Sequence, residues 1–207
     1  MHEHEIAQRA GYGSLQAFTR TFGPVFGMPP AQYRKHGTHR HFQAQKSGGN
    51  PMTLREVTIR TVPAMTAVTV DHTGSYMQIG KAFDALFGWL ASNDMLASVQ
   101  HAVGIFYDDP GAVAEDSLRS KAGAVLAAPI GVTAPLSLTE IAGGQYAVLR
   151  HRGPYADMAA AYQWLYGEWL PQSGREAADA PVFEEYLNNP RNTAPSELLT
   201  DICLPLR

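Results

Sequence analysis

The sequence predicts an α+β fold in which duplicated β-β-α-β units form a pseudo-twofold antiparallel-sheet domain, preceded by a small all-α segment. The first observation is a repeated five-residue motif, here called the histidine phrase: His72-Thr-Gly-Ser-Tyr76 recurs as His151-Arg-Gly-Pro-Tyr155, 79 positions later. The second is that each copy follows an alternating apolar run and precedes apolar residues at helical spacing. The third is a basic head with helical patterning, set off by a polar, glycine-rich stretch.

The two units are predicted from hydrophobic periodicity, which is two residues in strands and about 3.6 in helices. In the first unit, two strands, a helix and a strand are predicted over 57–61, 68–70, 79–90 and 102–107. In the second unit, the same order is predicted over 136–141, 145–151, 158–169 and 182–187. Two further strands are predicted at 118–127 and 199–206. A repeat of this length places the expected ligand site in the seam between the units.

Composition indicates a soluble globular protein with a sizeable core. The chain has 207 residues, of which 45% are hydrophobic. Its single cysteine, Cys203, cannot form an internal disulfide, which favours a reducing compartment. We interpret this cysteine as a small core residue. Because no apolar stretch approaches the roughly 20 residues that span a bilayer and no charged-then-apolar leader opens the chain, we expect a cytoplasmic protein without a membrane partner.

Charge is distributed unevenly and suggests two modules with different partners. Residues 1–50 carry six basic and two acidic side chains, whereas the remainder carries 10 basic and 17 acidic ones. A basic head suits phosphate, and an acidic body suits cationic or neutral ligands. We therefore divide the chain into a partial helix-turn-helix at 1–42, a linker at 43–52 and a body at 53–207.

The head has the pattern of a helix-turn-helix. A helical run ends at Gly11-Tyr12-Gly13, and Ser14 follows as the predicted N-cap of a second helix. Leu15, Phe18 and Phe22 fall on one face of that helix, which leaves polar side chains on the other face. In this motif the second helix enters the major groove and its outward polar residues meet base edges.

The run from Ile6 to Arg34 resembles the second helix-turn-helix of AraC-type regulators. It has the Gly-Tyr turn, Phe18-x-Arg20-x-Phe22 and Gly27-Met-Pro-Pro30. The resemblance implies DNA contacts by Ser14, Gln16, Thr19, Arg20, Tyr33 and Arg34. AraC-type domains contain two such units and the chain begins inside the second, so we expect DNA binding to be weakened and steeply salt-dependent. The alternative interpretation is a remnant that no longer binds an operator.

Histidines cluster at the edges of the head, at His2, His4, His36, His39 and His41. Their spacings differ from those of standard zinc sites, and no cysteine lies nearby. We interpret them as part of a solvated segment, and we expect neither a metal nor a cofactor. The repeated histidines of the body occur in both copies, which favours a structural role in a turn over catalysis.

The two units differ in one place that bears on function. With an offset of 79, Ile105 of the first unit corresponds to Glu184 of the second, so that an apolar wall and a carboxylate would face a shared ligand. Glu184 and Glu185 are adjacent in a predicted strand and must point to opposite faces. One interpretation puts both at a frayed strand end in water. The other puts one of them inward, as the counter-ion of a cationic ligand or as a general acid/base.

The body resembles the GyrI-like effector-binding domain, which also follows AraC-type and MerR-type DNA readers. The matching runs are Gly143–Val148, His151–Tyr155, Trp169–Gly174, Pro181–Asn188 and Leu204–Leu206. The resemblance implies that Glu184 is buried and that lipophilic cations or drug-like aromatics bind between aromatic plates. The candidate ligand-binding residues are Glu184, Tyr186, Tyr155, Trp164, Tyr146 and Phe106. For each aromatic residue, a place in the core is the alternative.

These observations favour a transcriptional regulator, whole or truncated, whose C-terminal domain senses an amphipathic, cationic or aromatic small molecule. The main alternative is a hydrolase, because some GyrI-like relatives use the matching glutamate to add water to strained electrophilic natural products. In that case Glu184 would be the catalytic general acid/base. A third interpretation, inhibition of gyrase by direct contact, rests on the name of the resembled family alone.

Overall fold

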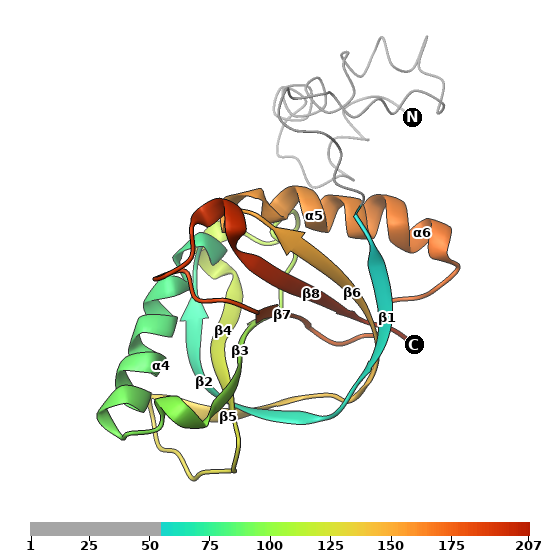
Figure 1. The fold of residues 1–207 in the computed structure, drawn as a ribbon. Coiled ribbons are helices and arrows are strands. Elements are labelled where there is room, and N and C mark those ends of the chain that lie inside the picture. Colours follow the sequence, from blue (N-terminus) through green and yellow to red (C-terminus); the bar gives the residue numbers. More distant parts are fainter. Residues whose placement is uncertain (1–54) are drawn as a thin grey trace, which may run out of the picture. The chain divides into compact units, whose positions relative to one another are not determined.

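The computed structural model describes residues 55–207 (Figure 1). The predicted helix-turn-helix, the linker, the histidine cluster and the six candidate DNA-binding residues lie outside these described residues. Their assignments, and the domain boundary at residue 53, therefore stay predictions from the sequence.

Eight strands form one antiparallel sheet in the order β1-β6-β8-β7-β3-β4-β2-β5. Their bounds are β1 Val57–Val62, β2 Met65–Thr73, β3 Val99–Phe106, β4 Arg119–Leu126, β5 Leu136–Ile141, β6 Gly144–Arg152, β7 Val182–Tyr186 and β8 Leu199–Pro205. Each of them was predicted from alternating or apolar runs, within a few residues at its ends. The sequence did not reveal that they join into a single sheet, in which β7 and β3 are the central pair.

Two helical segments cover one face of this sheet. The first is α4, Gly80–Ser92, which packs against β2 and β4. The second is α5, Met158–Trp164, which is continued by a π-helix, Leu165–Trp169, and by α6, Leu170–Ser173. Figure 1 shows α4 and the α5–α6 segment over different parts of the sheet. The expectation of helices on one side of antiparallel strands is confirmed.

The core is divided by the sheet into a helix-covered part and a part on the opposite face. Under α4, Leu86 and Leu90 are fully buried against Val68, and under α5, Leu165 is fully buried against Ile202. On the opposite face, a separate cluster is formed by Ala67, Val103, Ile105, Val125, Ile141, Tyr146, Val148, Phe183 and Cys203. Strand β8 is buried on both faces because it lies between these layers.

The repeated histidine phrase builds the same turn in two places. The His72 Nε2 atom lies 3.0 Å from the Ser75 carbonyl oxygen, and the His151 Nε2 atom lies 3.2 Å from the Pro154 carbonyl oxygen. The glycine in each phrase has a positive φ, 116° at Gly74 and 139° at Gly153, a backbone region that favours glycine. These contacts support the structural role expected of the histidines. The internal duplication itself stays a prediction.

Within residues 55–207, no helix is long and apolar enough to cross a membrane. Cys203 is buried, and its burial raises the pKa of the thiol well above the usual range. It is therefore a packed core residue, as the sequence predicted.

Candidate ligand-binding site

Glu184 lies in the middle of β7 on the helix-covered face, and only 6% of it is exposed. Both carboxylate oxygens accept hydrogen bonds. The Tyr162 hydroxyl donates to Oε1 at 2.8 Å, and the Tyr186 hydroxyl donates to Oε2 at 2.8 Å. Among the described residues, no basic side chain forms an ion pair with this carboxylate. The site is thus a buried acid held by two neutral donors.

Burial is the main influence on the protonation of Glu184. It disfavours the charged form and raises the pKa of the carboxyl, against which the two tyrosine hydrogen bonds act, and the result is a pKa of about 7. The group therefore changes charge near neutral pH. A glutamate in this range can exchange a proton or accept a positive partner with little cost at pH 7.

The alternation of β7 sets which glutamate faces inward. Glu184 and Tyr186 lie on the helix-covered face, whereas Glu185 lies on the other face, where its Oε1 atom is 2.6 Å from His101 Nδ1. The expectation that one of the two acids points inward is confirmed, and it is Glu184. The interpretation that both acids lie at a frayed strand end is wrong, because β7 pairs with β3 on one side and with β8 on the other.

The Tyr186 side chain, which donates to this carboxylate, lies among other aromatic rings. The Tyr186 ring makes edge-to-face contacts with Phe83 of α4, at 5.3 Å between ring centroids, and with Tyr155, at 5.5 Å. Nearby in the first unit, Tyr76 and Phe106 form another edge-to-face pair at 4.9 Å. Of the candidate ligand-binding residues, Tyr186 and Tyr155 therefore accompany Glu184, and Phe106 lies on the adjacent strand β3.

Two residues of this site were missed by the sequence analysis. Phe83 and Tyr162 lie within the predicted helices 79–90 and 158–169, but they were not among the candidate ligand-binding residues. Their spacing could not distinguish them from core residues, because the inner face of each helix covers both the core and the central strands. A signal was present in the tyrosine itself, since a buried hydroxyl needs a polar partner.

Two other candidates lie elsewhere. Tyr146 is buried on the opposite face of the sheet, where its ring contacts Phe183 at 5.4 Å and its hydroxyl donates to the Ala142 carbonyl oxygen at 2.7 Å. Its placement beside Glu184 was wrong because its position in β6 turns its side chain to the other face. The alternative, a place in the core, is the one that holds.

Trp164 also lies away from Glu184. It is two positions beyond Tyr162 on α5, and side chains two apart on a helix point about 200° apart. Its ring packs under the Arg55 guanidinium, at 5.9 Å, and borders a shallow cavity of about 170 Å³. That cavity is lined by Trp164, Glu168, Trp169, Gln172 and Ser173, and Glu184 is not part of it.

Within the predicted duplication, Gly104 rather than Ile105 matches Glu184. Matching hydrogen bonds show the shift: the Arg119 amide donates to Asp108 Oδ2 at 2.7 Å, and 80 positions later the Leu199 amide donates to Asn188 Oδ1 at 3.0 Å. The offset between like contacts is therefore 79 at the histidine turns and 80 at these later hydrogen bonds. The π-helix Leu165–Trp169 lies between the second histidine turn and β7, where this change of offset occurs.

The strand register agrees with this correction. Gly104 is paired with Glu184 across the central strands, whereas Ile105 is paired with Phe183 and packs in the cluster on the opposite face. The expected pair of an apolar wall and a carboxylate facing one ligand is therefore wrong for Ile105. The contrast that remains is between a glycine and a glutamate.

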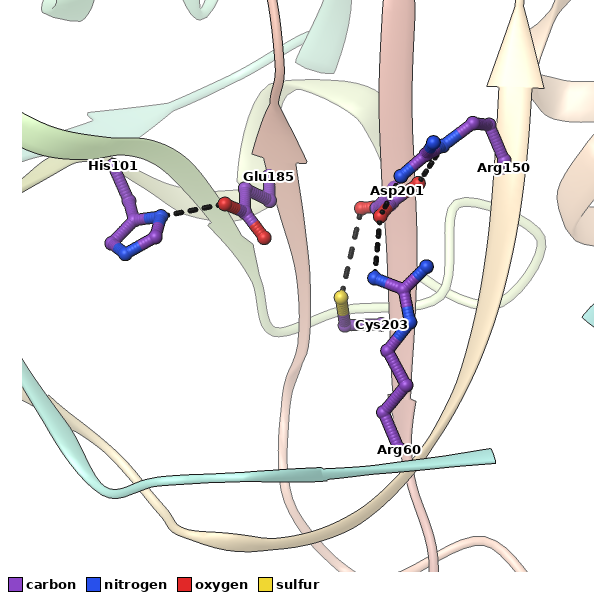
Figure 2. A network of polar contacts seen from close by, with 6 residues as sticks. All are labelled: Arg60, His101, Arg150, Glu185, Asp201 and Cys203. Carbon is purple, nitrogen blue, oxygen red and sulfur yellow. Dashed lines mark hydrogen bonds and ion pairs between the residues drawn. The ribbon is translucent and has the colours of Figure 1, made fainter. Parts of the chain in front are cut away.

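The opposite face carries a second acid in a different environment (Figure 2). Asp201 is fully buried, and its carboxylate accepts hydrogen bonds from Arg150 Nε at 2.7 Å and Arg60 Nη1 at 2.9 Å. Burial alone would raise the pKa of Asp201, but the hydrogen bonds and charges of the two arginines outweigh it and hold this pKa below its ordinary value. The negative charge of Asp201 is thus already balanced by two arginine side chains of the protein.

Replacing Arg150 with alanine is expected to destabilise the fold by about 1.5–3 kcal/mol, because it removes charge-assisted hydrogen bonds from a buried carboxylate. The matched control is Arg152→Ala on the same strand. Arg152 and its partner Glu197 are 3.8 Å apart and both exposed, so this change should cost less than about 1 kcal/mol. Urea unfolding of the two variants measures the difference, and equal losses would contradict this account of Asp201.

Comparison with known proteins identifies the family and agrees with the fold. Residues 55–207 match the GyrI-like small-molecule binding domain, and the chain belongs to this family. Among curated relatives, a protein of Escherichia coli K12 named probable transcriptional regulator YgiV is 32% identical over 104 residues, which are 50% of this chain and 65% of YgiV. A DNA gyrase inhibitor of the same organism is 33% identical over 116 residues, 54% of this chain and 71% of that protein. The chain thus spans somewhat less than two thirds of the length of YgiV.

Two solved structures share the fold. The C-terminal domain of EcmrR has a TM-score of 0.60 at 15% identity, covering 74% of this chain and 98% of that domain. The structure of SAV2435 bound to tetraphenylphosphonium has a TM-score of 0.50 at 16% identity, covering 73% of this chain and 94% of that protein. At these identities the likeness concerns the fold alone.

Proposed function

We propose that the protein is a transcriptional regulator whose C-terminal domain binds amphipathic organic cations at Glu184. The observation that carries this proposal is the contrast between the two buried acids. Asp201 has two arginines and a lowered pKa, whereas Glu184 has only tyrosine hydroxyls and a pKa of about 7. A positively charged ligand would stabilise the charged form of Glu184, as the two arginines stabilise the charged form of Asp201.

The surroundings of Glu184 suit a cation that also has apolar surface. The Tyr186 hydroxyl donates to the carboxylate, and the Tyr186 ring contacts the rings of Phe83 and Tyr155. Contacts between an organic cation and such rings contribute about 0.5–2 kcal/mol each. Because Glu184 is only 6% exposed, a ligand reaches it when a neighbouring ring moves aside.

The regulatory part of the proposal is supported by the head of the chain and by the relative named as a probable transcriptional regulator. The AraC-like run would bring Gln16, Thr19 and Arg20 to the major groove. The body would then report ligand binding to a DNA-binding head in the cytoplasm. This assignment rests on the sequence of residues 6–34, which the structure does not describe.

The experiment that tests ligand binding uses tetraphenylphosphonium as the probe. At pH 8, Glu184→Gln is expected to weaken binding of this cation about 10–100-fold, because the replacement keeps the shape but removes the charge. Isothermal titration calorimetry measures both affinities. The control is Glu185→Gln, which changes the neighbouring acid on the other face and should leave the affinity unchanged. Equal affinities of wild type and Glu184→Gln for tetraphenylphosphonium would contradict the proposal.

A second candidate function is hydrolysis, which the pKa of Glu184 favours. A carboxyl with a pKa of about 7 beside two phenolic hydroxyls at 2.8 Å has the properties of a general acid/base at neutral pH. Incubation with electrophilic cyclopropanoids distinguishes the two functions. An enzyme would give hydrated product that disappears in Glu184→Gln, and a sensor would bind without turnover.

A further inference from the structure

Gly104 occupies a position in β3 where no side chain fits. It is buried and is paired with Glu184 across the two central strands. A Cβ atom at this position would lie 2.8 Å from the Tyr186 hydroxyl oxygen and 2.9 Å from Cε2 of Phe106. Carbon atoms do not approach other heavy atoms this closely in packed proteins without a shift of the neighbours. Any larger residue must therefore displace an aromatic ring of the site.

The Tyr186 hydroxyl is the group that depends most on this space. The same oxygen that would touch the added Cβ donates to Glu184 Oε2 at 2.8 Å. Its ring is held by edge contacts with Phe83 and Tyr155, at 5.3 and 5.5 Å. A ring confined in this way cannot turn aside from Gly104 and still keep its hydroxyl on the carboxylate.

We propose that Gly104 is a positioning residue of the Glu184 site. The lack of a side chain at residue 104 creates the space from which the Tyr186 hydroxyl donates to the carboxylate, and this sets how firmly the carboxylate holds a proton or a cation. The part that concerns cations rests on the proposed function. The part that concerns the hydroxyl and the carboxylate stands on the distances alone.

The position of Gly104 also makes the site one-sided. Because Gly104 is the counterpart of Glu184, and Phe106 is the counterpart of Tyr186, the first unit presents neither a carboxylate nor a hydroxyl where the second presents both. An acid at residue 104 would lie directly across from Glu184, where like charges repel. The arrangement therefore holds a single negative charge, and it suits ligands with a single positive charge.

The test is a double-mutant cycle on the full chain with Gly104→Ala, Tyr186→Phe and the combination. The readout is the titration of the Glu184 carboxyl carbon by NMR, assigned by its loss in Glu184→Gln. Since the tyrosine hydrogen bond lowers the pKa of Glu184, Gly104→Ala should raise it above about 7, as should Tyr186→Phe. In the combination, the alanine should add no further rise, because the hydroxyl that it displaces is already absent.

The matched control is Gly123→Ala in β4. A Cβ there would be equally crowded, 2.9 Å from Val103 Cγ2 and 3.2 Å from Thr69 Cγ2, but it would not touch the Glu184 site. This variant should leave the titration of Glu184 at the wild-type pH. Affinity for tetraphenylphosphonium at pH 7 should fall about three- to tenfold in Gly104→Ala and stay unchanged in Gly123→Ala.

Two results would overturn the proposal: a Glu184 titration unchanged by Gly104→Ala, or alanine and phenylalanine effects that add in full. If Gly104→Ala does not fold, the double variant Gly104→Ala/Phe106→Leu relieves the contact with the Phe106 ring. In this variant the Glu184 carboxyl must still titrate at a higher pH than in wild type. The outcome is separable from the proposed function. Should Glu184→Gln bind the cation as well as wild type, the proposed function fails, while the titrations still decide the role of Gly104.

Discussion

Affinity for tetraphenylphosphonium is expected to fall about 100-fold when the pH is lowered from 8 to 5. With a pKa of about 7, Glu184 is mostly charged at pH 8 and mostly protonated at pH 5. If the cation binds only the charged carboxylate, affinity drops about tenfold for each pH unit below the pKa. The loss should begin near pH 7, well above the range in which an ordinary glutamate titrates. Fluorescence or calorimetric titrations at half-unit steps of pH measure this profile.

Glu184→Gln provides the control for the affinity profile. It cannot titrate, so its weaker affinity should vary little between pH 5 and 8. A neutral ligand of similar shape, triphenylphosphine oxide, should also show a flat profile with the wild type. Wild-type and Glu184→Gln curves that run parallel would contradict the assignment of Glu184 as the group that meets the cation.

The stability of the wild-type protein is expected to fall by about 2–3 kcal/mol as the pH rises from 5 to 8. The pKa of Glu184 is raised to about 7 in the folded state from 4.5, so between these values the folded state binds more protons than the unfolded state. Stability then decreases with rising pH through this window, and the penalty is complete above the folded-state pKa. Urea unfolding at several pH values measures it.

Glu184→Gln should lack this part of the pH dependence. The stability of Glu184→Gln relative to wild type should therefore be higher at pH 8 than at pH 5. Glu185→Gln is the matched control, since Glu185 is adjacent in sequence but pairs with His101 on the other face. A wild-type curve with the same slope as Glu184→Gln between pH 5 and 8 would show that the carboxyl is not desolvated as described.

Much of this fold was predictable because the periodicity of apolar residues identifies both strands and helices. Alternation of apolar residues identified the strands, and helical spacing identified α4 and the α5 segment. The same rule required Glu184 and Glu185 to face opposite ways. It could not say which of the two faces inward, and that choice came from the resemblance to a known family.

The errors came from features that alternation does not encode. The offset of 79 fails beyond the histidine turn, where like hydrogen bonds are 80 positions apart. A shift of one residue exchanges the two faces of a strand, which is why Ile105 was matched with Glu184 in place of Gly104. Tyr146 and Trp164 were assigned to the site by residue type, and their separation from Glu184 follows only once the strand register and the position of α5 are known.

The most direct measurement is the number of protons released when tetraphenylphosphonium binds at pH 7. Calorimetry in two buffers with different enthalpies of ionisation gives this number. With a pKa of about 7, half of the Glu184 carboxyls carry a proton, so a cation that requires the carboxylate should release about 0.5 proton per ligand. Glu184→Gln should release none. Binding to the wild type without proton release at pH 7 would contradict the central claim that the cation is held by Glu184.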